Sequence, residues 1–302
     1  MIYNSKKAWI VAADMGFGHY RAALPLLNIA NEGKIILANQ YEGIPQKDKS
    51  IWARQEQYYS AISRFSATPI IGPFAFRIFD QFQKIASFSP HKKEHAPSMQ
   101  LRYAYSLIKK GWGRHLIETL SRKPIPLFCS FSSIAYMADY WGYPAPIYLL
   151  LTDSDVSRAW ASLDSQKSKI IYLAPTKRAA DRLLTYGVPL SRIILTGFPL
   201  PQELQGENNE IAKRNFMRRL TVLDPRSFSH TDFKKHRPPC ILFSLGGAGA
   251  QQNIGKSIIQ STAPLIKKNE LHIMLALGTR PDIQSAFHTL IKKCGLGSFL
   301  NT

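Results

Sequence analysis

The chain has 302 residues, of which 45% are hydrophobic and 20% are charged. It is too apolar to remain disordered, and it is long enough for two modest domains or one large one. Its 39 Lys and Arg against 20 Asp and Glu leave a net charge of +19, which favours phosphate-bearing partners such as nucleic acid, anionic lipid or nucleotide-linked substrates.

No targeting or membrane-spanning segment is expected. The apolar run at residues 8–13 is too short for the core of a signal peptide, and runs such as 144–151 fall short of the roughly 20 residues that cross a bilayer. The three cysteines, Cys129, Cys240 and Cys294, stand far apart, so we expect buried free thiols rather than a disulfide framework or a zinc site. These features predict a cytoplasmic protein that is soluble or attached peripherally to a membrane.

The first residues predict a strand, a turn, a helix and a strand. Residues 8–13 form an apolar run, Gly16 and Gly18 break it, residues 20–30 carry apolar side chains at helical spacing, and residues 34–38 are apolar again. This order is typical of a βαβ unit.

The same alternation continues to residue 200. We expect strands at 126–130, 146–152, 170–174 and 193–196, and helices at 133–140 and 176–186. Alternating elements favour a mostly parallel sheet with helices on both faces. Residues 1–200 are therefore predicted to form an α/β, Rossmann-like domain.

The character of the chain changes after residue 200. Residues 201–239 are polar and basic, and they read as a linker with one helix near 210–220. A second Rossmann-like domain is expected at 240–302, with strands at 240–245 and 271–277 and helices at 254–267 and 283–293. Two βα units in about 60 residues fall short of an ordinary domain of this type, so we expect this second domain to be incomplete.

The strongest local signal for chemistry lies after the first strand. Gly16 and Gly18 allow a ligand to approach the backbone, and the helix that follows offers free N–H groups. His19 stands at this entrance, where a group with a pKa near 7 can act as a general base. The alternative is an ordinary strand-to-helix turn in which His19 only packs or caps.

A second glycine loop, residues 246–250, occupies the same position in the second domain. Gly246, Gly247 and Gly249 could admit a diphosphate, or they could form a bare turn. Neither loop contains the GK[ST] of a P-loop, which excludes ATP hydrolysis by that route.

Thr152 and Asp153 end an apolar strand, where open α/β sheets place ligand-binding residues. Asp155, Arg158 and Trp160 follow closely. The alternative is that these carboxylates cap the next helix.

The segment 69–93 predicts an amphipathic helix with an aromatic face that includes Phe74, Phe79 and Phe82. It either packs on the protein's own core or lies in a membrane interface. The second possibility gains support from Lys92 and Lys93, which begin a basic stretch reaching residue 123, and from Trp112, an interfacial anchor between two glycines.

Three segments together resemble a known family. Residues 13–22 read A-D-x-G-x-G-H-x-x-A, residues 174–199 form a helix ending in Gly-Val before a strand that ends T-G-x-P, and residues 246–250 read GGAGA. This pattern resembles the monogalactosyldiacylglycerol synthase group of glycosyltransferases, whose relatives include the peptidoglycan lipid-II N-acetylglucosaminyltransferase.

The resemblance implies a GT-B fold, in which two Rossmann-like domains face each other. The first domain would bind a lipid or glycan acceptor and the second a UDP-sugar, and a hexosyl group would be transferred with inversion. His19 would be the general base or a group that positions the acceptor, with Asp14 as competitor or helper. The acceptor side would include Gly16, Gly18, Thr152 and Asp153, and the donor side Gly246, Gly247 and Gly249. No metal and no cofactor beyond the UDP-sugar substrate would be required.

Two departures leave alternatives open. The family's Thr-Asp strand end is usually followed by a His shortly before the Trp, but Ser157, Arg158 and Ala159 precede Trp160 here. The later donor-domain residues that grip phosphate and ribose are absent from the 302 residues. The alternatives are a non-catalytic lipid- or glycan-binding protein, or a partner that completes the donor domain. Nucleic-acid binding rests on net charge alone, because no recognition motif accompanies it, and we consider it disfavoured.

Overall fold

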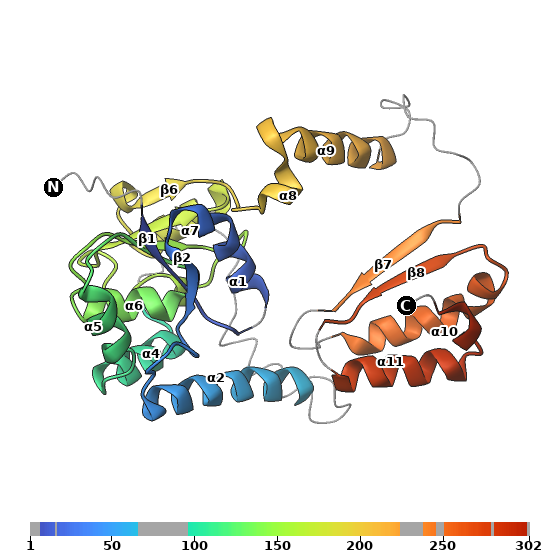
Figure 1. Ribbon diagram of the computed structural model, residues 1–302, viewed down its shortest axis with the longest axis horizontal. Helices are drawn as coiled ribbons and strands as arrows, with labels where there is room; N and C mark the ends of the chain where they lie inside the picture. The colour runs from blue at the N-terminus through green and yellow to red at the C-terminus, as the bar shows by residue number, and fades with distance from the viewer. Residues whose placement is uncertain are drawn as a thin grey trace. The chain divides into compact units, whose positions relative to one another are not determined.

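The computed structural model describes residues 7–15, 17–65, 96–223, 238–245, 251–278 and 281–300. Within these ranges the chain forms two compact units (Figure 1). The first comprises residues 7–57 and 96–212, and the second comprises residues 58–65 and 213–300.

The first unit is built on a six-stranded parallel sheet, which confirms the predicted α/β, Rossmann-like architecture. Its strands run in the order β2-β1-β3-β4-β5-β6. Their bounds are β1 (Ala8–Ala12), β2 (Ala30–Leu37), β3 (Leu127–Cys129), β4 (Ile147–Leu150), β5 (Ile170–Ala174) and β6 (Ile193–Leu195). Because β1 lies between β2 and β3, the strand order reverses at β1, which makes the β1/β3 pair the topological switch point.

Helices cover both faces of this sheet, as predicted. Alternate residues of β1 point to opposite faces, so Ile10 belongs to a small core with α1 (Phe17–Ala23) and the 3-10 helix η1 (Leu24–Ile29). Val11 belongs to the larger core on the other face. That core includes residues of α2 (Gln46–Phe65), α4 (Met99–Lys109), α5 (Arg114–Ser121), α6 (Ser132–Tyr140) and α7 (Lys177–Thr185).

The first βαβ unit differs from prediction in its boundaries. The helix expected at 20–30 begins at Phe17 and becomes a 3-10 helix at Leu24, where Pro25 lacks the N–H that an α-helix would use. Strand β2 begins at Ala30 rather than at residue 34. Its pairing with β1 shifts between Ala8 and Ile10, and Glu32 and Gly33 adopt positive φ. This bulge inserts polar residues that conceal the start of the strand in the sequence.

Three helices that the apolar pattern did not predict, α2, α4 and α5, supply much of the larger core. The interfacial-anchor prediction for Trp112 is wrong, because its side chain is fully buried and contacts the Trp52 ring edge-on, with centroids 4.9 Å apart. Basic side chains such as Arg102 and Arg114 lie on the exposed faces of the same helices. The basic stretch is therefore, over its described part, the solvated side of helices whose other side packs on the sheet.

The second unit contains a two-stranded parallel sheet, β7 (Cys240–Ser244) and β8 (His272–Ala276). Figure 1 shows the helices α10 (Gln252–Lys267) and α11 (Pro281–Lys293) against this sheet. Gly255 of α10 lies against the Phe243 ring, so the absence of a Cβ lets helix and strand approach closely. The side chains of Leu242 and Met274, by contrast, are about 60% exposed. Between β6 and β7 the chain forms α8 (Gln202–Gln205) and α9 (Glu210–Leu223), and α9 confirms the helix expected near 210–220.

The cysteine prediction is confirmed only in part. All three thiols are free, and Cys129 is buried, but Cys240 is exposed at the start of β7. Among the helices of the described ranges, none combines the length and the apolar character needed to cross a bilayer.

Candidate functional site

The candidate site lies at the carboxyl ends of β1, β3 and β4. His19 is in α1, directly after β1; Ser130 follows β3; and Asp153 follows β4. Ligands of open parallel sheets bind at this edge, beside the strand pair where the order reverses. Topology thus brings together residues that are more than 100 positions apart in the sequence.

The imidazole of His19 is held on three sides. Its Nδ1 is 2.7 Å from the carbonyl oxygen of Ser130. The Phe131 ring meets it edge-on with centroids 4.7 Å apart, and the Trp160 ring lies 6.2 Å away. Because a carbonyl oxygen can only accept, Nδ1 must carry the hydrogen of this bond. In the neutral ring, Nε2 therefore has a free lone pair and can accept a proton.

The surroundings favour this neutral form. Burial lowers the pKa of His19 below its ordinary value of about 6.5, and this effect outweighs the hydrogen bond to Ser130 and the charge of Asp153, which both raise it. At neutral pH the ring is thus a base rather than a cation. The Asp153 carboxylate is placed to stabilise the imidazolium that forms when Nε2 takes a proton.

Asp153 has a raised pKa. The residue keeps an exposed surface. Even so, neighbouring protein atoms limit the hydration of its carboxylate and raise the pKa, against the lowering effects of His19 and of a hydrogen bond from Trp160. Asp153 and Trp160 are thus linked to each other and to His19. Thr152 precedes Asp153 in the same loop and is half-buried.

Asp14 is engaged elsewhere. Its carboxylate accepts a hydrogen bond from Gln40 Nε2 at 2.9 Å, and its backbone forms two bonds with the Asn39 side chain. These partners follow β2, on the side of β1 away from Ser130. The described interactions therefore join His19 to Asp153, and Asp14 to Gln40.

Gly18, in the first turn of α1, borders open space, since a Cβ placed there would meet nothing within 4 Å. Gly18 directly precedes His19 in the sequence. Gly16 lies outside the described residues, as do Gly246, Gly247 and Gly249 of the expected donor loop and Phe74, Phe79, Phe82, Lys92 and Lys93 of the expected membrane segment.

Sequence reasoning missed Ser130 and Phe131, which hold His19. Ser130 is 1% exposed, and its Oγ has no hydrogen-bond partner within the described part of the chain. Helix α6 starts two residues later, and no side-chain hydrogen bond caps its first turn. Polar residues between an apolar strand and a helix were the signal that could have revealed this corner.

An apolar groove opens at the same end of the sheet. Its volume is about 330 Å³, and no charged residue lines it. The walls come from Pro25 and Leu26, from Leu150 and Leu173, and from the segment after β6, including Phe198 and Leu200. Pro25 and Leu26 follow His19 by a few residues in the sequence, and Leu150 shortly precedes Asp153. The groove suits an uncharged, apolar chemical group.

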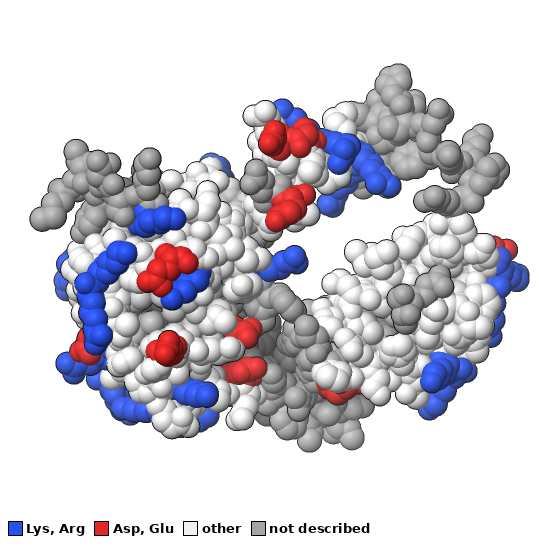
Figure 2. Space-filling view, in the orientation of Figure 1, with Lys and Arg blue, Asp and Glu red and all other residues white. Residues whose placement is uncertain are grey.

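Charge on the first unit is distributed rather than gathered. On the face shown in Figure 2, Lys and Arg side chains lie at separate places with Asp and Glu among them. Some are paired, as in Arg114–Glu118 and Lys177–Asp181, each 2.7 Å apart. Within the described ranges no three His, Cys, Asp or Glu side chains are grouped so that they could hold a metal ion.

Comparison with known proteins gives one match. Residues 228–301 match a family model described as a domain of unknown function, DUF6938. This stretch falls in the second unit and covers well under half of the chain, and its description names no activity. No curated protein and no solved structure matches the chain.

Proposed function

We propose that the chain is a GT-B glycosyltransferase that moves a hexosyl group from a UDP-sugar to a hydroxyl of a lipid-linked or membrane-bound acceptor. The observation that carries the proposal is the 2.7 Å contact of His19 Nδ1 with the Ser130 carbonyl, which leaves Nε2 as a base at the switch point of the sheet. The sequence resemblance, which would make His19 the base and residues from 240 a nucleotide-sugar domain, supports the proposal.

The reaction needs one proton acceptor and one departing group. The acceptor hydroxyl would lose its proton to His19 Nε2 while its oxygen bonds to the anomeric carbon of the sugar. The bond from that carbon to the diphosphate breaks at the same time, and UDP leaves with the electron pair, which inverts the anomeric centre. Asp153 stabilises the charge that develops on the imidazole, which accords with its effect on the pKa of His19.

Two further features support an apolar acceptor. The groove of about 330 Å³ offers an uncharged surface at the same end of the sheet as His19, where part of a lipid chain could be held. Each methylene buried there would contribute about 0.8 kcal/mol. The net charge of +19 would attract the protein to an anionic membrane.

The test is an assay of sugar transfer. The protein is incubated with vesicles containing anionic lipid and candidate acceptor lipids, and with a panel of UDP-sugars labelled in the sugar. We expect label in the organic-extractable lipid with at least one donor. Binding to the vesicles without transfer from any donor would support the alternative of a non-catalytic lipid-binding protein.

Membrane attachment is tested separately, with the double variant Phe79→Asp/Phe82→Asp. If the segment at 69–93 lies in the interface, this variant is released from anionic vesicles and keeps its melting temperature. A loss of folding would instead assign the segment to the core.

A further inference from the structure

The loop after β4 carries Asp153 and Trp160, two of the residues around His19, and helix α7 holds this loop at three consecutive positions. We propose that Arg182 of α7 is a positioning residue: its ion pair with Asp155 fixes the loop that brings Trp160 beside the His19 ring and carries Asp153. The inference rests on the proposed function, because it assigns Arg182 a role in the same site.

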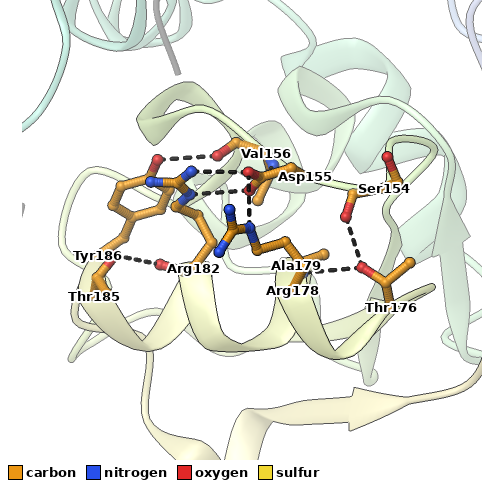
Figure 3. Close-up of polar contacts among 9 residues, drawn as sticks. All are labelled: Ser154, Asp155, Val156, Thr176, Arg178, Ala179, Arg182, Thr185 and Tyr186. Carbon is orange, nitrogen blue, oxygen red and sulfur yellow. Dashed lines mark hydrogen bonds and ion pairs between the residues drawn. The ribbon is translucent and has the colours of Figure 1, made fainter. Parts of the chain in front are cut away.

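The Arg182–Asp155 pair has a fixed geometry. Arg182 Nε donates to one carboxylate oxygen of Asp155 at 2.9 Å, and Nη2 donates to the other at 2.8 Å (Figure 3). The Arg182 side chain is 3% exposed and that of Asp155 is 25% exposed. A two-pronged bond between planar groups sets direction as well as distance. Asp155 is two residues from Asp153, so this bond determines where the chain passes just after the site.

The neighbouring residues are held by the same helix. Thr176, which caps α7, donates from its Oγ1 to the Ser154 carbonyl at 2.6 Å. The hydroxyl of Tyr186, which ends α7, donates to the Val156 carbonyl at 2.9 Å. Figure 3 shows these contacts along one side of the helix, with Arg178 as a second cation on Asp155. Residues 154, 155 and 156 are thus each fixed from α7.

The far side of the loop is fixed as well. Trp160 ends a short 3-10 helix, and the carbonyl of the preceding Ala159 accepts a bond from Tyr136 Oη at 2.6 Å. The guanidinium of the buried Arg158 donates to the carbonyls of Ala161 and Ser162. Trp160 is therefore held from both sides of the loop, by α7 before it and by these bonds around it.

Stability alone does not account for an arginine at position 182. Helix α7 already buries Ala179 and Leu183 fully in the core of the first unit. A buried ion pair is often no more stabilising than apolar residues of similar volume, because both charges lose their hydration. What the pair adds is a defined position for the loop that carries Asp153 and Trp160.

The test uses two conservative variants. Arg182→Lys keeps the charge but cannot form the two-pronged bond, and Tyr186→Phe removes the hydroxyl that bonds to Val156. The controls lie on the same helix: Lys177→Gln breaks an exposed ion pair, and Leu183→Val destabilises the core but removes no hydrogen bond or ion pair to the loop. The readout is the ring-nitrogen resonances of histidine in the intact 15N-labelled protein, with His19 identified through a His19→Gln variant.

We expect Arg182→Lys and Tyr186→Phe to shift the His19 ring resonances, whereas Lys177→Gln and Leu183→Val leave them in place. In the transfer assay, Arg182→Lys is expected to lower kcat by roughly tenfold to a hundredfold with little change in the KM for the donor, since a small misplacement of a catalytic group has effects of this size. Unchanged His19 resonances in both loop variants, or equal shifts in Leu183→Val, would overturn the inference. Because the resonances are measured without substrate, a protein that transfers no sugar but shows the expected shifts would refute the proposed function alone.

Discussion

The two units bury their sheets differently. In the first unit β1 is buried at four of its five positions. In the second, β7 is exposed at four of its five positions, and β8 alternates between exposed and partly buried residues. Parallel strands are normally covered on both faces. The core of the first unit extends over both faces of its sheet, but that of the second unit lies between the sheet and the helices α10 and α11. The first unit therefore supplies a rigid edge on which a site can be built.

A pair of leucine variants tests this comparison most strongly. Leu149→Ala in β4 removes a fully buried side chain and is expected to cost about 2–5 kcal/mol of unfolding free energy. Leu242→Ala in β7 removes a side chain that is 62% exposed, and its cost should stay within about 0.5 kcal/mol. Hydrogen exchange followed by mass spectrometry measures each unit separately. If Leu242→Ala destabilised its unit as much as Leu149→Ala does, the outer face of β7 and β8 would have to be covered in solution.

A second pair makes the same change at a glycine in each unit. Gly255→Ala would press a Cβ into the Phe243 ring, so we expect a loss of about 1–3 kcal/mol in the second unit. Gly18→Ala points into open space at a helical position and should be neutral or stabilise the first unit by up to about 1 kcal/mol.

Gly18→Ala also separates an effect on sugar transfer from an effect on stability. If Gly18 keeps the acceptor side open, Gly18→Ala lowers the rate of transfer although it does not destabilise the protein. Melting temperature and transfer rate, measured on one preparation, separate the two effects. Full activity in this variant would remove Gly18 from the acceptor site.

The smallest expected effect is a shift along the pH axis. Because burial lowers the pKa of His19, the ring becomes protonated only at a pH lower than 6.5. The fall of the transfer rate on the acid side (the acid limb) should therefore be centred below that value. Asp153 raises the pKa of His19, so Asp153→Asn should move the limb to still lower pH. The pH dependence of kcat/KM for the wild type and for Asp153→Asn measures both. A limb that moved to higher pH in the variant would contradict the assigned interaction.

The stability of the protein should also depend on the protonation of His19. The folded pKa of His19 is lowered, so between that pKa and 6.5 the unfolded chain binds more protons than the folded one. The stability of the first unit is therefore expected to fall as the pH drops from 6.5 towards the folded pKa, and this loss should be absent in His19→Gln. Urea unfolding at a series of pH values checks the difference.

The strands of the first unit were predictable because their apolar runs are short and are separated by turn residues. The predicted helices at 133–140 and 176–186 correspond closely to α6 and α7. Helices α2, α4 and α5 were missed because their apolar faces are narrow, as in α5 with Leu116, Ile117 and Leu120, and basic residues are frequent on the exposed side. The start of β2 was hidden by its bulge.

The candidate site was predictable only in part. The glycines and the position after a strand marked His19, and the strand end marked Asp153. The hydrogen bond between His19 and Ser130 depends on the reversal of strand order at β1, which no local pattern encodes. The same topology explains why the carboxylate that acts on His19 is that of Asp153, whereas Asp14, the expected helper, is bonded to Gln40.

The central claim is that His19 is the base of a sugar transfer at this edge of the sheet. The most direct test compares the wild type with His19→Ala in the transfer of labelled hexose from a UDP-sugar to lipid in anionic vesicles. We predict a loss of roughly 10²- to 10⁴-fold in the rate, the range expected for a general base, with melting temperature and vesicle binding unchanged. A His19→Ala variant that transfers sugar as fast as the wild type would contradict the claim.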